Sequence, residues 1–181
     1  MNKNLIWLTP LAIIGSAVSC YAVQYLTVDQ AQQLCFGKTC TFGSSPVKLT
    51  DQQKEAIKRD SSIDVRFNEQ KVWKVMAADE LIGWFLLDEV VGKHELITWA
   101  LALNADGSVR QIEILDYRET YGSEVRNQKW RQQFVGKKHG AVLKLDQDIQ
   151  NISGATLSSR HVTDGVKRLL DRKSTRLNSS H

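Results

Sequence analysis

The stretch ELITWALALNADGSVRQIEILDY, residues 95 to 117, decides the fold. Large apolar side chains occupy alternate positions of its first half, with small residues between them: Ile97, Trp99, Leu101 and Leu103. Such a period of two is typical of a strand with one face in the core. The NADG segment, 104 to 107, fits a hairpin turn because glycine tolerates positive φ. The two halves are therefore predicted to be paired antiparallel strands, 95–103 and 108–117.

The segments around this hairpin predict further strands and helices. Strands are expected at 71–77 and 81–90, and the second is so continuously apolar that we expect burial on both faces. Helices are expected at 27–34, 49–60 and 123–134, with Thr27 and Thr50 as N-caps of the first two. A final helix follows Thr156. Helices, then strands, then helices indicate an α+β domain with an antiparallel or mixed sheet and flanking helices.

The positive charge of the chain lies at its two ends. The formal net charge is +4 over 181 residues. Residues 1–22 and 172–181 contain four of the basic residues and no acid, so the rest carries 20 basic and 20 acidic residues. A nucleic-acid-binding surface would need a basic stripe with interleaved aromatics, and none is evident. The sequence therefore predicts no nucleic-acid partner.

The first 22 residues have the organisation of an export signal. Lys3 precedes the apolar run LIWLTPLAIIGSAVS, which is short for a membrane span, and a small residue, Ala22, stands where a signal peptidase would cut. We expect cleavage there and a periplasmic or extracytoplasmic location. Two alternatives remain open: retention of the segment as a membrane anchor, and lipidation of Cys20. Residues 23–171 are then the functional domain.

The last ten residues differ in composition from the domain. The segment RKSTRLNSSH, 172–181, has one aliphatic residue and no periodicity, and it resembles translated adapter sequence. We expect it to be a non-native or disordered tail.

Two cysteines follow the export signal. Cys35 and Cys40 lie in CFGKTC, and an exported protein meets an oxidising compartment, so a disulfide is the expected state. The alternatives for these two cysteines are a redox-active dithiol and half of a metal site. Zinc is disfavoured because there is no second cysteine pair or histidine cluster, and His94 stands alone as a possible ligand.

The segment DIQNISGATLSS, 148–159, leads into the last helix. Thr156 is suited to an N-cap role, as is Ser158. The same position suits a phosphate, because the helix N-terminus offers free N–H groups and the positive end of its dipole. Gly154 and Ala155 keep the preceding backbone nearly bare, so a large group can approach. A phosphate esterified to the Thr156 oxygen would be well placed.

These residues resemble the flavinylation motif of the FMN-binding domain family. In that motif an Asp precedes Ser-Gly-Ala-Thr, and a Ser or Thr follows two residues later; here Asp148 precedes the motif, which continues to Ser158. A second block supports the resemblance: the hairpin 92–122 ends in ETYG, 119–122, before a segment with Trp130 and Phe134. Members include small flavin subunits of Na⁺-translocating NADH:quinone reductase and Rnf complexes and single-domain exported proteins. Tyr121 replaces a proline of the large-complex members, which favours the exported type.

The resemblance implies FMN joined to Thr156 by a phosphoester bond, installed by an FAD-dependent FMN transferase. The implied cofactor-binding residues come from both blocks: Ser153, Gly154, Ala155, Thr156, Leu157, Ser158, Glu119, Thr120, Tyr121 and Gly122. Tyr121 and Trp130 are stacking candidates, although aromatic residues belong more often to the core. Arg118, Lys144 and Arg160 are candidate phosphate partners by charge, although a solvated surface position is the commoner role for each.

An exported electron carrier is the function that this assignment predicts, relaying electrons from a membrane redox partner to an extracytoplasmic acceptor. The cofactor would supply the redox chemistry, because no nucleophile–base pair or paired carboxylates are evident and a dinucleotide fingerprint is absent. A cofactor-free binding or scaffold module of the same fold is the alternative. A reductase acting on a small substrate ranks below the carrier, because the domain lacks a separate substrate-binding half.

Overall fold

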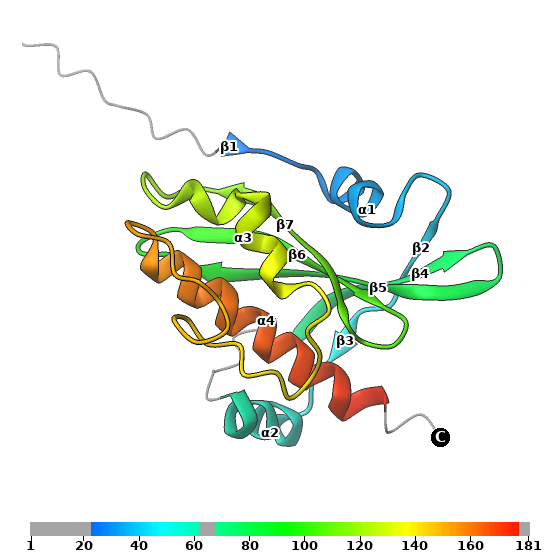
Figure 1. Cartoon of the computed structure of the whole chain (residues 1–181). Coiled ribbons are helices and arrows are strands. Elements are labelled where there is room, and N and C mark those ends of the chain that lie inside the picture. The colour runs from blue at the N-terminus through cyan, green and yellow to red at the C-terminus, as the bar shows by residue number, and fades with distance from the viewer. Residues whose placement is uncertain (1–22, 62–67, 178–181) are drawn as a thin grey trace, which may run out of the picture.

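The computed structural model describes residues 23–61 and 68–177, which form a twisted antiparallel sheet with helices on both faces (Figure 1). The order along the sheet is β1-β7-β6-β5-β4-β2, and β3 also pairs with β4. The main strands are β4 (Glu69–Ala77), β5 (Glu80–Val91), β6 (Leu96–Asn104) and β7 (Val109–Tyr117). Every strand pairing in the described residues is antiparallel. The α+β prediction is confirmed, and the sheet is antiparallel rather than mixed.

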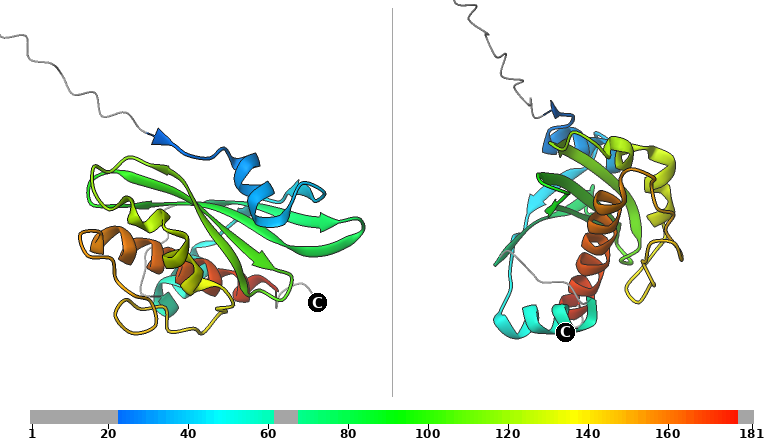
Figure 2. Two further views of the ribbon diagram at one scale, coloured as in Figure 1. Left: turned by 45° about the horizontal axis from the view of Figure 1, so that its top comes forward. Right: turned by 90° about the vertical axis from the view of Figure 1, so that its left-hand side faces the viewer.

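The alternation of residues 97–103 divides the core as predicted. Ile97, Trp99, Leu101 and Leu103 are fully buried under the C-terminal helix, α4 (Thr156–Leu177). The small residues Ala100 and Ala102 face the other side, where α1 (Val28–Phe36) packs. Figure 2 shows these two helices on opposite faces of the sheet. Strand β5 is accordingly covered on both faces.

The predicted hairpin turn and helix caps are present. Gly107 has φ +86° and donates its N–H to the Asn104 carbonyl at 2.9 Å. Thr27 and Gln30 form a reciprocal capping box at the start of α1. Thr50 and Gln53 do the same at the start of α2 (Asp51–Ser61), which packs against α4. Each box satisfies two N–H groups that a helix start would leave unpaired.

The helix predicted over 123–134 is wrong as a single element. The segment forms a 3-10 turn η1 (Ser123–Arg126), a short helix α3 (Gln128–Arg131) and a second 3-10 turn η2 (Gln132–Phe134). Asn127 interrupts it with extended backbone (φ −60°, ψ 123°), and its side chain accepts from the Lys129 N–H at 2.9 Å. Asparagine favours this local capping bond over the helix interior.

Three short edge strands were not predicted from the sequence: β1 (Val23–Gln24), β2 (Thr41–Ser44) and β3 (Val47–Lys48). At the other end of the chain, α4 continues past residue 171 to Leu177, so part of the segment expected to be a non-native or disordered tail is helical. Extending a formed helix costs little compared with starting one. The export signal lies outside the described residues. Among those described, no helix is long and apolar enough to cross a membrane.

The predicted disulfide is absent, and Cys35 and Cys40 are free thiols. Cys35 is buried on the inner side of α1, and burial raises its pKa to about 12. The Cys40 thiol instead donates to the Phe36 carbonyl at 3.1 Å. The two thiols therefore serve different local contacts, one in the core and one at the end of α1.

Candidate functional site

Thr156 begins α4 and is exposed. The preceding turn closes with a bond from the Ala155 N–H to the Ile152 carbonyl at 3.0 Å, and Gly154 takes φ +83° inside it. Ala155 occupies the N-cap position, since its carbonyl accepts the first helical bond from the Ser159 N–H at 2.9 Å. Alanine has no oxygen in its side chain to cap the helix. Thr156 is thus the first helical residue rather than the cap.

The start of α4 is left without a side-chain cap. In the described part of the chain, the N–H groups of Thr156, Leu157 and Ser158 make no hydrogen bond. The Thr156 hydroxyl itself only accepts a long contact, 3.4 Å, from the side-chain amide of Asn151. Free N–H groups at the positive end of a 22-residue helix favour a phosphate. The residues present therefore fit a phosphoryl group attached at Thr156.

Gly154 and Ala155 play different parts in this turn. A Cβ placed on Gly154 would meet no atom within 4 Å, so the backbone is open to solvent there, as the sequence suggested. Ala155 is buried with 4% of its surface exposed, and its methyl group faces Gly122. Ser153 and Leu157 are exposed on either side of the turn. Ala155 thus seats the turn, while its exposed neighbours remain available to a ligand.

The ETYG turn, residues 119–122, lies directly against this helix start. A Cβ built on Gly122 would come within 3.2 Å of both the Ala155 Cβ and the Ser158 Oγ. The Tyr117 hydroxyl, just before the turn, lies 2.5 Å from the Tyr121 carbonyl oxygen and 3.1 Å from Ser158 Oγ. The two blocks that the sequence analysis singled out are therefore in contact, and Tyr117 joins them.

The side chains of the ETYG turn point in different directions. Tyr121 is 81% exposed and Thr120 is exposed, so both side chains are accessible to a ligand. Glu119 instead accepts from the N–H groups of His94 at 2.5 Å and Glu95 at 2.9 Å, in the loop between β5 and β6. Partial burial raises the pKa of Glu119, but these backbone donors outweigh it and hold the pKa below its usual range. Glu119 therefore orders a loop.

Residues 92–171, which contain both blocks, match the FMN-binding domain family. This part of the chain belongs to that family. A subunit of the proton-translocating ferredoxin:NAD(+) oxidoreductase complex of Clostridium ljungdahlii is 25% identical over 183 residues, covering 97% of this chain and 91% of that protein. A subunit of the Na(+)-translocating NADH-quinone reductase of Vibrio anguillarum is 30% identical over 142 residues, covering 69% of this chain and 52% of that protein.

A solved structure supports the fold of the FMN-binding domain. NqrC of Shewanella oneidensis superposes with a TM-score of 0.54 at 17% identity, covering 87% of this chain and 90% of that one. At this identity the likeness concerns the fold alone. The family match and the two sequence relatives confirm the sequence-based assignment to the FMN-binding domain family.

The candidate phosphate partners of the FMN-binding domain separate into two groups. Lys144 and Arg160 line one hollow of about 360 Å³ beside α4, together with Lys167. In the described part of the chain none of these three makes an ion pair. Arg160 stands one helical turn after Thr156, on the same side of α4. Arg118, by contrast, is paired with Asp116 at 2.8 Å. Arg160 is thus the better placed cation.

Asp148 lies in a loop before the motif and is used structurally. Its carboxylate accepts from the N–H groups of Leu143 (3.1 Å) and Lys144 (2.8 Å) and pairs with Lys137 at 2.9 Å. Partial burial raises the pKa of Asp148, but these donors outweigh it and lower the pKa overall. Asp148 therefore fixes the loop 143–148, and no contact with Thr156 is present.

Trp130, a candidate for stacking on the flavin, and His94, a possible metal ligand, both lack the role that the sequence suggested. Trp130 is buried, packs edge-on against Phe134 at 5.1 Å between ring centroids, and donates to the Gln150 carbonyl at 2.7 Å. It belongs to the core and holds the approach to the SGAT turn. His94 is exposed, and the described residues contain no cluster of three metal-binding side chains. The sequence did not point to Asn151 or Tyr117 as site residues. Asn151 contacts Thr156 and Tyr117 contacts Ser158, and no local sequence pattern predicts either contact.

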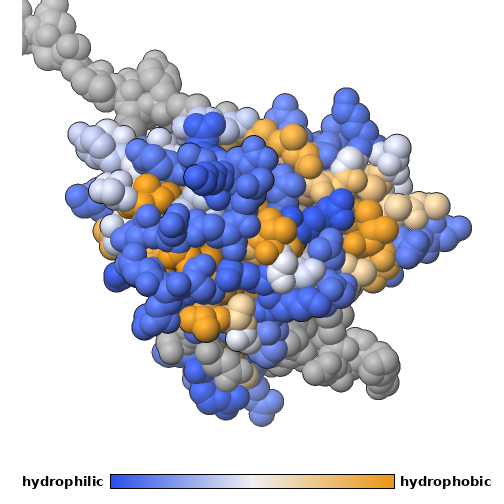
Figure 3. Space-filling view, in the orientation of Figure 1, coloured by the Kyte–Doolittle hydropathy of each residue, from blue (hydrophilic) through white to orange (hydrophobic). Residues whose placement is uncertain are grey.

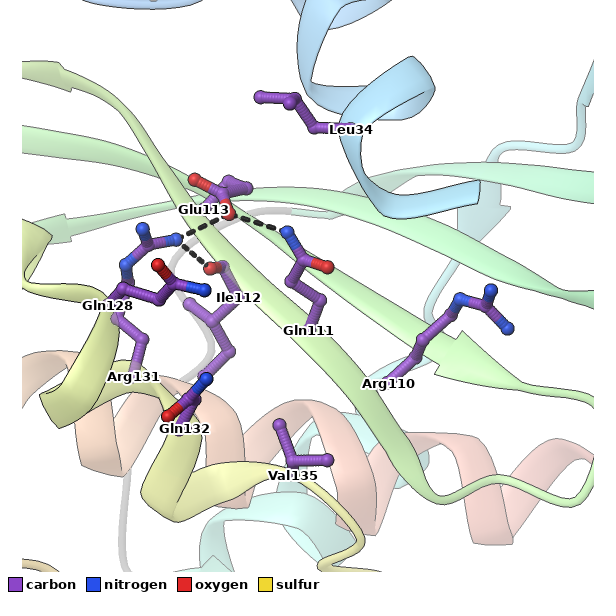
Figure 4. A pocket seen from close by; sticks show the side chains of 9 residues that line it. All are labelled: Leu34, Arg110, Gln111, Ile112, Glu113, Gln128, Arg131, Gln132 and Val135. Carbon is purple, nitrogen blue, oxygen red and sulfur yellow. Dashed lines mark hydrogen bonds and ion pairs between the residues drawn. The ribbon is translucent and has the colours of Figure 1, made fainter. Parts of the chain in front are cut away.

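A second hollow, of about 410 Å³, lies at the edge of β7 below α1 (Figure 4). Its floor is an ion pair between Glu113 and Arg131, 2.5 Å apart, and Arg131 also donates to the Ile112 carbonyl. Gln111 donates to Glu113 at 2.7 Å. This pair covers part of the strand edge, a common protection against unwanted pairing with another strand.

The face of the molecule seen in Figure 3 is mostly hydrophilic, with scattered apolar patches.

Proposed function

We propose that this FMN-binding domain is an exported electron carrier, with FMN attached covalently through a phosphoester bond to the Thr156 oxygen. The observation that carries the proposal is the exposed Thr156 hydroxyl at a helix start whose N–H groups have no side-chain cap. When bound, FMN would supply the redox chemistry, while the protein supplies position and electrostatic surroundings.

Attachment requires a phosphoryl donor and a partner enzyme. In the proposed step an FAD-dependent FMN transferase presents FAD, the Thr156 oxygen forms a bond to the phosphorus of the FMN half, and the phosphoanhydride bond breaks. AMP leaves with the bonding electrons, and the hydroxyl proton passes to a base or to solvent. The free N–H groups of Leu157 and Ser158, with Arg160 one turn further, are positioned to hold the resulting phosphodiester.

The cellular setting is part of the same proposal. Residues 1–22 would direct the chain out of the cytoplasm or anchor it at the membrane, and residues 23–171 would act there as the FMN-binding domain. A membrane redox partner is proposed because the named relatives are subunits of ion-translocating oxidoreductases. Covalent attachment would keep the flavin where free FMN is scarce.

The proposal is tested by co-expressing the chain with an FAD-dependent FMN transferase and viewing denaturing gels under ultraviolet light. Wild type should give a fluorescent band, and Thr156→Val should give none. Ser45→Ala is the matched control, because Ser45 is an exposed hydroxyl outside both blocks of the site, and its band should persist. A dark wild-type band with an active transferase would favour the cofactor-free scaffold, and a fluorescent Thr156→Val band would refute the site.

A further inference from the structure

The hydroxyl of Tyr117 joins the two halves of the site. Tyr117 ends β7, and its ring is 3% exposed within the main core. Its hydroxyl oxygen lies 2.5 Å from the carbonyl oxygen of Tyr121 and 3.1 Å from the hydroxyl of Ser158. Because the ring is fixed by packing, the hydroxyl is a rigid anchor point rather than a flexible one.

The direction of both hydrogen bonds follows from counting protons. A carbonyl oxygen can only accept, so the single proton of the Tyr117 hydroxyl is donated to Tyr121. Ser158 must then donate its own proton to the Tyr117 oxygen. Burial raises the pKa of Tyr117, which keeps the phenol protonated and able to donate. The hydroxyl of Ser158 is thus committed inward and is not a donor to the cofactor.

The turn is also packed closely against Tyr117. Gly122 follows Tyr121 directly, and a Cβ at Gly122 would approach the Tyr117 hydroxyl oxygen to 2.6 Å. The turn is therefore held on the first residues of α4, with Ala155 and Ser158 below it. The Tyr121 side chain extends from this fixed point into solvent, 81% exposed, beside the helix start that bears Thr156.

We propose that Tyr117 is a positioning residue for the flavin. Its two hydrogen bonds fix the backbone that carries Tyr121 relative to the helix start that carries Thr156, so that the Tyr121 ring stacks on the isoalloxazine ring. This inference rests on the proposed attachment of FMN at Thr156. Aromatic rings favour offset stacking, and a phenol ring in contact with an excited flavin quenches its fluorescence. Stacking therefore has a spectroscopic signature separate from folding.

The test is time-resolved flavin fluorescence on the flavinylated chain, which resolves a short-lived stacked population and a long-lived unstacked one. Tyr117→Phe keeps the buried ring and removes only the hydroxyl. Since a hydrogen bond of this kind shifts an equilibrium by roughly fivefold, the stacked-to-unstacked ratio should fall by about that factor. Tyr121→Leu should abolish the short-lived population.

Two further variants separate positioning from general stability. In the Tyr121→Leu background, Tyr117→Phe should leave the flavin lifetimes unchanged, because the residue through which Tyr117 acts is missing. Thr163→Val is the matched control, since it removes a buried hydroxyl that donates to the Ser159 carbonyl within α4, and its lifetimes should equal wild type. Ser158→Ala tests the same contact with Tyr117 intact, should Tyr117→Phe not fold.

Lifetimes of Tyr117→Phe and Ser158→Ala that match wild type, while their unfolding temperatures fall, would overturn the inference and leave a structural role only. An equal effect of Tyr117→Phe with and without the Tyr121 ring would also overturn it. A wild type that carries no flavin would refute the proposed function and this inference with it, so the two failures are distinguishable.

Discussion

Gly122 and Tyr117 are so close that no side chain fits between them. A Cβ on Gly122 would lie 2.6 Å from the Tyr117 hydroxyl oxygen, and the glycine also takes φ +91°. Both conditions follow from the way the ETYG turn is seated on the start of α4. Only glycine meets them without strain.

Gly122→Ala should therefore destabilise the domain through strain and overlap together. We expect a loss of about 3 kcal/mol in the free energy of unfolding, measured by denaturant titration. Gly140→Ala is the matched control, because Gly140 has a similar φ, +83°, and open space around it, so only about 1 kcal/mol should be lost. Equal losses of unfolding free energy in the two variants would show that overlap with the Tyr117 hydroxyl does not destabilise Gly122→Ala.

The ion pair between Arg168 of α4 and Asp88 of β5 should be sensitive to removal of one partner. The two side chains are 6% and 1% exposed, so removing Arg168 leaves a buried Asp88 carboxylate without this ion pair. Arg168→Leu should lower the free energy of unfolding by about 3–5 kcal/mol, and Arg168→Leu with Asp88→Leu should recover part of the loss. The half-exposed neighbour Lys167→Gln should stay within about 0.5 kcal/mol of wild type. A single variant as stable as wild type would contradict this account.

Asp148 should make stability fall in acid. Its pKa is lowered in the folded state, so it stabilises the fold above its unfolded pKa of about 3.9. That contribution is lost as the pH falls through the lower folded value. Unfolding temperatures of wild type should therefore drop more steeply between about pH 5 and pH 2 than those of Asp148→Asn. Asp146→Asn, at an exposed position in the same loop, should keep the wild-type slope.

Arg160 should contribute to flavin transfer, whereas Arg118 should not. Arg160 makes no ion pair in the described residues and stands one turn after Thr156, while Arg118 is engaged by Asp116. A charge-assisted hydrogen bond to phosphate suggests that Arg160→Gln slows transfer by about tenfold. Initial rates of flavin incorporation with a purified transferase measure this, with Arg118→Gln as the matched control. Equal rates for both variants would remove Arg160 from the site.

The elements with local signals could be predicted from the sequence. The alternation around Trp99 located β6, and Thr27 and Thr50 located two helix starts, because each signal acts within a few residues. The break in the helix at Asn127 depends on a small local preference for capping. The short edge strands depend on pairing with strands that are distant in sequence. The Tyr117–Ser158 contact spans 41 residues, so no local pattern indicates it. The same applies to Glu119, which orders a loop 24 residues before it.

The central claim is a phosphoester bond between FMN and the Thr156 oxygen. Its most direct test is mass spectrometry of the tryptic peptide 145–160, LDQDIQNISGATLSSR, from protein made with an active FMN transferase. The peptide should carry one FMN, and fragmentation should place it on Thr156. An unmodified peptide, or an adduct on Ser153, Ser158 or Ser159, would contradict the account.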